Sequence, residues 1–196
     1  MGINVIFDLI GSFIIGGMLL VNIITMQGNA NKQSSLYSVT DIAQKNLVTS
    51  AEIIENDFRK MGYGVNDPTK CIYEADTSKI IFFSDIDRNG SIDTIKYYLG
   101  PTSELANTPN PRDRLLYRVI DSETPKSSNL GITRFFLQYY DQDMNPVAGN
   151  VNAIRIIEIT LWVECPFPVE DPSTGQLKYP DAFWRQTRIT ARNMER

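Results

Sequence analysis

The sequence contains no histidine and only two cysteines, Cys71 and Cys165. The absence of histidine excludes His-dependent acid–base catalysis, Ser-His-Asp and Cys-His triads, and most catalytic zinc sites. Two cysteines cannot supply a four-thiolate metal site. In an oxidising compartment they can form one disulfide, and the alternative is two buried thiols that are not joined. Because no base, nucleophile and orienting group can be assigned together, we predict that the protein is not an enzyme.

Basic side chains are missing altogether from the first 31 residues, and the first one in the chain is Lys32. The whole chain has a formal net charge of −4 and no basic stripe with interleaved aromatic residues. This charge pattern predicts that nucleic acid is not a partner. Apolar residues make up 42% of the chain and charged residues 21%, which is an ordinary globular composition rather than a disordered one.

The N-terminal segment 5–27 is predominantly apolar, and Asp8 is its only ionisable side chain. As a helix it would be roughly 35 Å long, enough to span a bilayer with some tilt. We favour a retained membrane helix in residues 1–30, and the alternative is a secretory signal cleaved near Gly28. A carboxylate in such a segment either faces a partner or reaches water at the headgroups. Ser12 and Gly16 form a small-xxx-small pair that lets another helix approach closely, although glycine is common in membrane helices generally.

Residues 31–64 are predicted to form the amphipathic half of the same long helix. Apolar residues recur there at steps of three or four: Leu36, Val39, Ala43, Leu47, Ala51, Ile54, Phe58 and Met61. Such a one-sided stripe normally lies on a hydrophobic core. The polar stretch 26–35 predicts a bend or weak point, and Gly62 and Gly64 are natural stop signals.

Residues 65–196 change to a period of two and are predicted to form one antiparallel β-rich domain. The expected strands are 71–75, 79–86, 92–99, 114–121, 132–141, 153–165 and 184–192. In the clearest of them Ile157, Ile159, Leu161 and Val163 point to one side, and polar residues point to the other. The long spine helix and this sheet together predict an α+β fold in which the helix stripe packs on one face of the sheet.

The segment SDIDRNGSID carries an acidic cluster with two alternative interpretations. Its candidate metal ligands are Asp85, Asp87, Asn89 and Asp93, which match four ligand positions of a calcium loop, although Lys96 stands where a bidentate glutamate is expected. The rival is a tight type I′ hairpin at Asn89-Gly90, because Asn-Gly is the leading signal for that turn. A tight turn would pair Ile80 with Leu99 and Phe82 with Tyr97, and would send the aspartates to opposite sides.

Several patches resemble those of type IV pilin-like proteins, in particular minor pilins of the W type and minor pseudopilins of the J type of type II secretion. ENDFRKMGYG (55–64) resembles the end of their spine helix, and FFSDIDRNGSIDTIKYYL (82–99) resembles their hairpin and Tyr-bearing strand. LLYRVID (115–121) and RQTRITARN (185–193) resemble their L-Y-R strand and closing strand. The order and spacing of these patches agree over most of the chain.

The resemblance implies a structural, minor filament subunit, anchored by its N-terminal helix, with the globular domain in the periplasm or at the cell surface. Its implied partners are other pilin or pseudopilin subunits, contacted through Asp8, Ser12 and Gly16, with Asp8 facing a neighbour's terminal amine. The implied processing site is Gly2, which would place Asp8 at the sixth mature position, whereas the family has a basic leader and a glutamate at the fifth. The alternative function is a monomeric single-span protein whose domain binds a ligand or calcium. No certain cofactor is predicted.

Overall fold

The computed structural model describes residues 2–170, 174–189 and 193. The chain divides into two compact units, Met1–Val39 and Thr40–Arg196. The boundary therefore lies within the long helix, and the last part of that helix belongs to the β-rich unit. The sequence pattern alone divides the chain at residues 30 and 64 instead.

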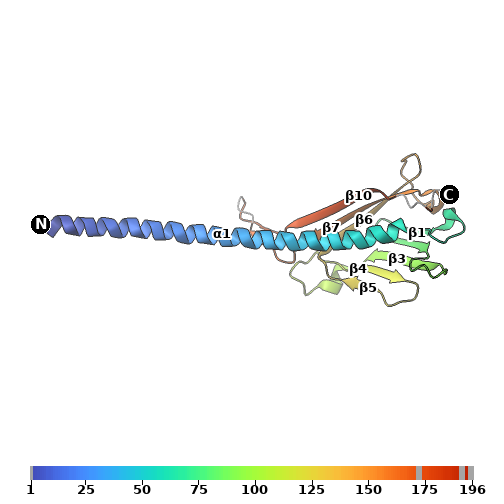
Figure 1. Cartoon of the computed structure of the whole chain (residues 1–196), viewed down its shortest axis with the longest axis horizontal. Helices are drawn as coiled ribbons and strands as arrows, with labels where there is room; N and C mark the ends of the chain where they lie inside the picture. The colour runs from blue at the N-terminus through green and yellow to red at the C-terminus, as the bar shows by residue number, and fades with distance from the viewer. Residues whose placement is uncertain (1, 171–173, 190–192, 194–196) are drawn as a thin grey trace. The chain divides into compact units, whose positions relative to one another are not determined.

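The first element is a single helix, α1 (Gly2–Arg59), which is drawn in blue to cyan in Figure 1. Residues 26–35 are helical without interruption, so the bend expected there is wrong. Glycine and asparagine lower helix propensity by no more than about 1 kcal/mol each, which flanking helical turns can offset. The helix ends just before Gly62, which has a φ of 75° and donates its N–H to the Phe83 carbonyl at 2.9 Å.

The second part of α1, from Thr40 onward, packs its apolar stripe into the core of the β-rich unit. The stripe residues in this part are all buried: Ala43, Leu47, Ala51, Ile54 and Phe58, with Met61 just beyond the helix. Phe58 is fully buried, and its ring lies 5.4 Å from that of Phe82 and 5.7 Å from that of Tyr97. Deleting such a ring would cost about 3–5 kcal/mol, so this contact is a main anchor of helix to sheet.

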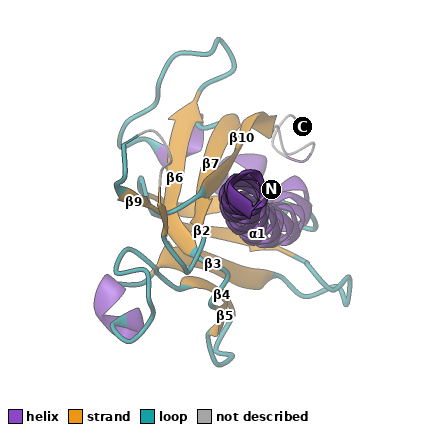
Figure 2. Cartoon of the chain, turned by 90° about the vertical axis from the view of Figure 1, so that its left-hand side faces the viewer, coloured by secondary structure: helices purple, strands orange, loops and turns teal. Residues whose placement is uncertain are grey.

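The first sheet is a five-stranded antiparallel meander. Its strands follow chain order: β1 (Ile72–Ala75), β2 (Lys79–Ser84), β3 (Asp93–Leu99), β4 (Leu116–Ile120) and β5 (Lys126–Ser128). Short 3₁₀ turns precede β1 (Pro68–Lys70) and follow β3 (Thr102–Leu105). The face made by Ile80, Phe82, Ile95 and Tyr97 is at most 1% exposed and lies against α1, which Figure 2 shows beside the sheet.

The second sheet has three antiparallel strands in the order β10-β7-β6. These are β6 (Ile132–Tyr140), β7 (Ile156–Glu164) and β10 (Asp181–Ile189), with a third 3₁₀ turn (Val151–Ala153) before β7. A small hairpin, β8 (Val169–Glu170) with β9 (Leu177–Lys178), connects β7 to β10. The inward face of β7 is buried as predicted, but Glu158 and Thr160 on its other face are buried too. β7 is the central strand of this sheet, so side chains of the strands along both its edges flank these two residues, and alternation alone does not reveal this.

The long helix packed on antiparallel sheet confirms the predicted α+β class. The seven expected strands are present, while β5, β8 and β9 were missed because they are two or three residues long. The end of the last expected strand, 190–192, lies outside the described residues.

Candidate functional site

The predicted assembly residues of α1 lie at a constant spacing of four. Asp8, Ser12 and Gly16 therefore share one helix face, which the helix repeat of 3.6 residues keeps nearly in line. The Ser12 hydroxyl donates a hydrogen bond of 2.8 Å to the backbone carbonyl of Asp8. This bond does not involve the Asp8 carboxylate. A Cβ at Gly16 would meet no atom within 4 Å, and Gly2 is exposed near the start of the helix. No other part of the chain that the structure describes therefore blocks the approach of a second helix at Gly16.

Among the described residues, one helix is long and apolar enough to cross a membrane, judged by length and composition. Its most apolar 18-residue window has a mean hydropathy of 2.1 and buries none of its residues inside the chain. A membrane anchor and a signal sequence both satisfy this description. Because exposed side chains such as Phe7, Phe13 and Met26 find no cover in their own chain, this segment needs an apolar environment outside it.

The acidic segment forms a loose eight-residue connection, residues 85–92, instead of the tight turn. β2 and β3 pair Ile80 with Tyr97 and Phe82 with Ile95, so the predicted register is wrong by two residues. A shift of two keeps every side chain on its predicted face, which explains why the core face was still right. In place of the two-residue turn, the Asp85 carboxylate accepts hydrogen bonds from the Asn89 and Gly90 amides and holds the wider loop together.

Within this loop the three predicted aspartates converge. One carboxylate oxygen each from Asp85, Asp87 and Asp93 lies within 4.8 Å of the others, a spacing that a hard cation such as calcium can use. Asp85 and Asp93 are buried and Asp87 is exposed. Burial, opposed by a hydrogen bond from the Ile86 amide, raises the pKa of Asp93, and the Asp87 charge raises it further. Asn89 instead donates its side-chain amide to Asp87 and accepts from Ser91, so it braces the loop.

A buried polar network that the sequence analysis missed ties α1 to the first sheet. The Asp57 carboxylate accepts from the Tyr97 hydroxyl and from Arg118 Nε, both at 2.5 Å, and Arg118 Nε lies 3.2 Å from the Tyr97 hydroxyl. Burial and then the Asp57 charge raise the pKa of Tyr97 above its usual range. Burial alone would lower the pKa of Arg118, but Asp57 raises it overall. Each residue lies in a different sequence patch, ENDFRK, TIKYYL or LLYRV, and nothing in these patches by themselves indicates that the three side chains meet.

Cys71 and Cys165 form no disulfide; both are buried and they are not joined. Cys71 lies against Gly62, where an added Cβ would be 3.3 Å from the Cys71 Cβ, whereas Cys165 contacts the backbone of Ala43. Cys165 is thus near position 43 of α1, and Cys71 is near the residues just beyond its end at position 59. These two positions are about 24 Å apart at 1.5 Å per residue, whereas a disulfide needs Cα atoms within about 7 Å. Burial raises the pKa of the Cys71 thiol to about 11 and also raises that of Cys165.

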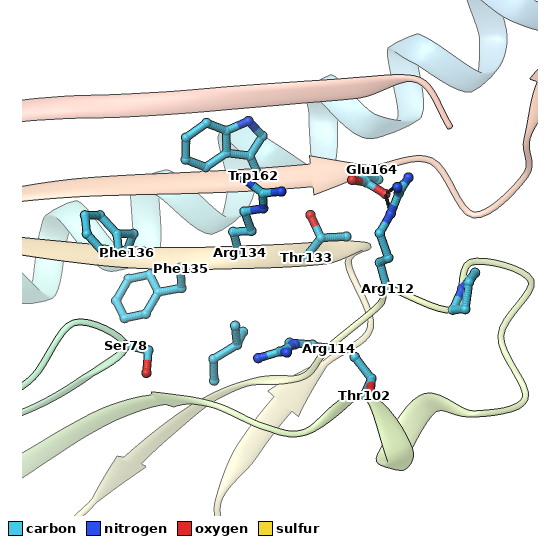
Figure 3. Close-up of a pocket in the computed structure, with 12 residues that line it drawn as sticks. Ser78, Thr102, Arg112, Arg114, Thr133, Arg134, Phe135, Phe136, Trp162 and Glu164 are labelled. Atoms are coloured by element: carbon cyan, nitrogen blue, oxygen red, sulfur yellow. Dashed lines mark hydrogen bonds and ion pairs between the residues drawn. The ribbon is translucent and has the colours of Figure 1, made fainter. Parts of the chain in front are cut away.

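A pocket of about 580 Å³ opens between the start of β6 and the segment that leads into β4, as Figure 3 shows. Three arginines line it, Arg112, Arg114 and Arg134, with Glu164 as the only acidic residue of the lining. Other lining residues supply hydroxyl groups or apolar surface: Ser78, Leu99, Thr102, Pro111, Thr133, Phe135, Phe136 and Trp162. The formal charge of the lining is therefore +2, counting three arginines and one glutamate.

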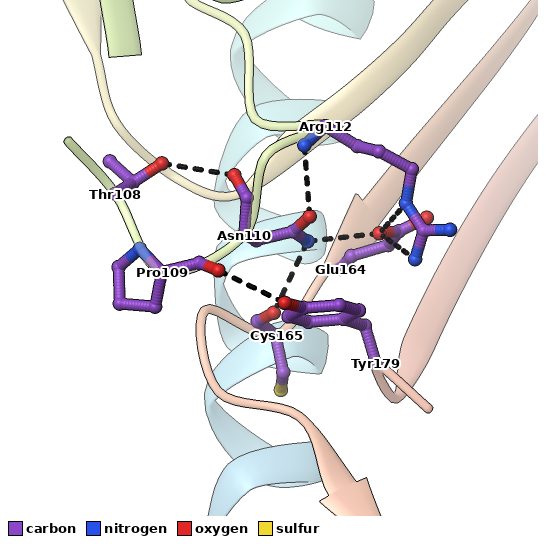
Figure 4. Close-up of polar contacts among 7 residues, drawn as sticks. All are labelled: Thr108, Pro109, Asn110, Arg112, Glu164, Cys165 and Tyr179. Atoms are coloured by element: carbon purple, nitrogen blue, oxygen red, sulfur yellow. Dashed lines mark hydrogen bonds and ion pairs between the residues drawn. The ribbon is translucent and has the colours of Figure 1, made fainter. Parts of the chain in front are cut away.

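The Asn110 network in Figure 4 fixes one side of this pocket. Asn110, fully buried, donates to Glu164 at 2.9 Å and to the Cys165 carbonyl at 3.4 Å, and its side-chain oxygen accepts from the Arg112 amide. Arg112 in turn forms an ion pair of 2.8 Å with Glu164 and lies over the Tyr179 ring. The single acid of the lining is thus already engaged, and it cannot neutralise the other two arginines.

Two buried groups beside the pocket have no hydrogen-bond partner among the described residues. They are both carboxylate oxygens of Asp113, a residue that is 1% exposed, and the hydroxyl of Thr133. Burial raises the pKa of Asp113, the nearby Thr108 hydroxyl opposes this rise, and the Glu164 charge adds to it. No sequence pattern marked this region, because its residues come from a proline-rich loop and two strand ends that meet only in the fold.

No protein-family model matches the chain, and no curated protein is significantly similar to it in sequence.

Proposed function

We propose that this protein is a structural, minor subunit of a type IV pilus-like or secretion pseudopilus filament. Its N-terminal helix is the anchor and the filament contact, and its β-rich domain lies outside the cytoplasm. Other subunits of the pilin or pseudopilin type are its partners. Its role is mechanical and not catalytic.

The observation that carries the proposal is the division of one continuous helix into two parts of different character. In α1 the large apolar side chains from Val5 to Met26 are exposed in the single chain, while Ala43 and the stripe residues that follow it are buried in their own domain. A bilayer or a bundle of like helices would cover the first part, and a filament provides such a bundle after the subunit leaves the membrane. A helix used as an anchor alone does not need the regular face of small residues beside Asp8.

Asp8 is the residue on which assembly is proposed to depend. Within a helix bundle its carboxylate would pair with the terminal amine of a neighbouring subunit, because a buried charge is tolerable only when a partner completes it. Removing one member of such a pair costs roughly 3–5 kcal/mol. Asp8→Ala should therefore leave the domain folded and the protein in the membrane, yet reduce its incorporation into filaments, and Asp8→Glu should be tolerated better.

One observation favours a second candidate function, a monomeric membrane-anchored calcium-binding domain. It is the convergence of the Asp85, Asp87 and Asp93 carboxylates. The two functions differ in what Asp8→Ala does, because a monomer has no neighbour for Asp8 to meet.

The test is to express the full chain, wild type or Asp8→Ala, in its native host, shear the cells and measure the protein in the filament and membrane fractions. We expect the wild type in both fractions and the variant mainly in the membrane. Equal amounts of the two proteins in the filament fraction would contradict the pairing role. Intact mass of the purified wild type shows in the same preparation whether the chain is cleaved after Gly2.

A further inference from the structure

The arginine pocket, between β6 and the segment that leads into β4, holds two cations without a counter-charge. They are Arg114 and Arg134, and neither guanidinium forms a hydrogen bond or ion pair with any residue that the structure describes. The third arginine of the lining, Arg112, is already paired with Glu164 at 2.8 Å. Two like charges beside one cavity repel each other, and an anion bound there would remove this repulsion. The charges of the pocket therefore favour an anionic ligand.

The fold holds both guanidinium groups in place before a ligand arrives. Arg134 lies over the Trp162 ring, 5.7 Å from its centroid. Arg114 is half-buried, and its backbone amide donates to the Ile132 carbonyl at 2.8 Å, which ties the segment before β4 to the start of β6. Figure 3 shows the two arginines on these two different segments of the chain. Cations that the fold has already positioned lose little conformational entropy when they bind an anion.

The Thr133 hydroxyl is a further polar group of the lining that the chain itself does not use. Thr133 is 7% exposed, and its hydroxyl has no hydrogen-bond partner among the described residues. It lies at the irregularity in the pairing of β6 with β7, where strand alternation is interrupted, so Thr133 and the adjacent Arg134 both line the pocket. A buried hydroxyl without a partner costs stability, and an anion bound beside it would accept its hydrogen bond.

The size and apolar lining of the pocket select the body of the ligand. The cavity of about 580 Å³ is within the range of small-molecule sites. Leu99, Pro111, Phe135 and Phe136 supply apolar surface, and Phe136, in the middle of β6, is 41% exposed. Inorganic phosphate would meet the arginines but leave this surface in water. A long polyanion such as nucleic acid needs an extended basic surface, whereas the whole chain has a net charge of −4.

We propose that the arginine pocket binds a small organic anion, a molecule in which one carboxylate or phosphate group is joined to an apolar or aromatic body. Arg114, Arg134 and the Thr133 hydroxyl bind the anionic group, and Phe136 packs against the body. Guanidinium groups suit both head groups, because their N–H donors match the paired oxygens of carboxylate and phosphate. The inference does not depend on the filament function, since all these residues belong to the β-rich unit.

The test is isothermal titration calorimetry of the purified full chain in detergent, with detergent alone as the blank. Benzoate and phenyl phosphate are the anionic probes, and they share an aromatic ring but differ in head group. Benzamide, the neutral counterpart of benzoate, and inorganic phosphate, which has no apolar body, are the comparison probes. We expect saturable binding of at least one aromatic anion, and binding at least about tenfold weaker for each comparison probe, because each lacks one of the two features. The tighter aromatic anion identifies the head group.

Two variants test whether the probe binds in this pocket. Arg114→Gln with Arg134→Gln removes both cations and should weaken binding by about tenfold or more, because hydrogen bonds to charged groups are the strong ones. Thr133→Val keeps the shape of the side chain and removes only the unpartnered hydroxyl, so it should weaken binding several-fold without lowering Tm. Arg59→Gln with Lys70→Gln removes two exposed charges elsewhere. This matched control should leave the affinity unchanged.

The absence of saturable binding for both aromatic anions at millimolar concentration overturns the proposal. Benzamide that binds as tightly as benzoate also overturns it, as does inorganic phosphate that binds as tightly as phenyl phosphate. A double glutamine variant that keeps the wild-type affinity and the near-ultraviolet circular dichroism of the folded domain has the same consequence. If that variant does not fold, Thr133→Val decides, because an unchanged affinity for the probe then contradicts the site.

Discussion

Replacing Arg118 by methionine should destabilise the β-rich unit strongly, because it leaves the Asp57 carboxylate buried without its cation. The Asp57 side chain is 3% exposed and that of Arg118 is 25% exposed. Breaking a buried ion pair costs about 3–5 kcal/mol, and the partial exposure of Arg118 favours the lower end of that range. For a unit of this size 1 kcal/mol corresponds to about 2–4 °C in Tm, so we expect Tm to fall by about 6–12 °C.

The same network predicts how other changes combine with Arg118→Met. Tyr97→Phe removes one hydrogen bond to a charged group and should cost about 1.5–3 kcal/mol. Asp57→Leu combined with Arg118→Met removes both charges, so it should cost less than the two single changes added together. Arg59→Met is the control, since the Arg59–Glu55 pair is on the surface and such pairs contribute at most about 1 kcal/mol.

The assay is thermal unfolding of the full chain in detergent, followed by near-ultraviolet circular dichroism. Trp162 and Trp184 lie in β7 and β10, so this signal reports the packing of the domain and not the helicity of the apolar segment. A Tm decrease below about 2 °C for Arg118→Met, or strictly additive losses in the double variant, would refute the view that Asp57 depends on a buried partner.

Three further predictions concern the loop, the thiols and the buried carboxylate. If the three aspartates bind calcium, millimolar calcium should raise Tm and Asp87→Ala should abolish the increase, whereas an unchanged melting curve would leave only a braced loop. Because burial raises the pKa of Cys71 to about 11, iodoacetamide at pH 8 should label neither native cysteine, and both should be labelled after unfolding without reductant; rapid labelling of native protein would contradict their burial. Because the pKa of Asp113 is raised in the folded chain, its ionisation opposes folding. Asp113→Asn should therefore raise Tm at pH 7, and the gain should disappear as the pH falls below the ordinary value of 3.8; a lower Tm at pH 7 would show that the charge has a stabilising partner.

Most of the fold was predicted from the spacing of apolar residues along the sequence. The stripe from Ala43 to Met61 and the alternation in β7 were predicted correctly because helix and strand repeats put buried side chains at fixed spacings. The register of β2 and β3 was predicted wrongly, because the Asn-Gly signal for a tight turn does not show that a carboxylate four residues before the asparagine will hold a wider loop in place. Asp85 does so here, and this competition depends on three-dimensional placement.

The candidate sites were predictable only where their residues lie close in sequence. Asp85, Asp87 and Asp93 lie on one loop, so their convergence could be anticipated. Asp57, Tyr97 and Arg118 are spread over three elements, and their meeting depends on the packing of α1 against β3 and β4. The arginine pocket is harder still, since its charges come from a loop and from the start of β6, which no periodic pattern connects. The disulfide prediction was wrong for the same reason, because Cys71 lies just beyond the C-terminal end of α1, by Gly62, whereas Cys165 lies by Ala43, more than four helical turns earlier.

The filament role is tested most directly by cryo-electron microscopy of filaments sheared from native cells, with this chain identified in them by a specific antibody or tag. The account predicts that the apolar part of α1 lies at the filament centre, among the helices of neighbouring subunits, with the β-rich unit on the outside. A chain found only as dispersed single molecules in the membrane, with no filament that contains it, would contradict the account and favour the monomeric alternative.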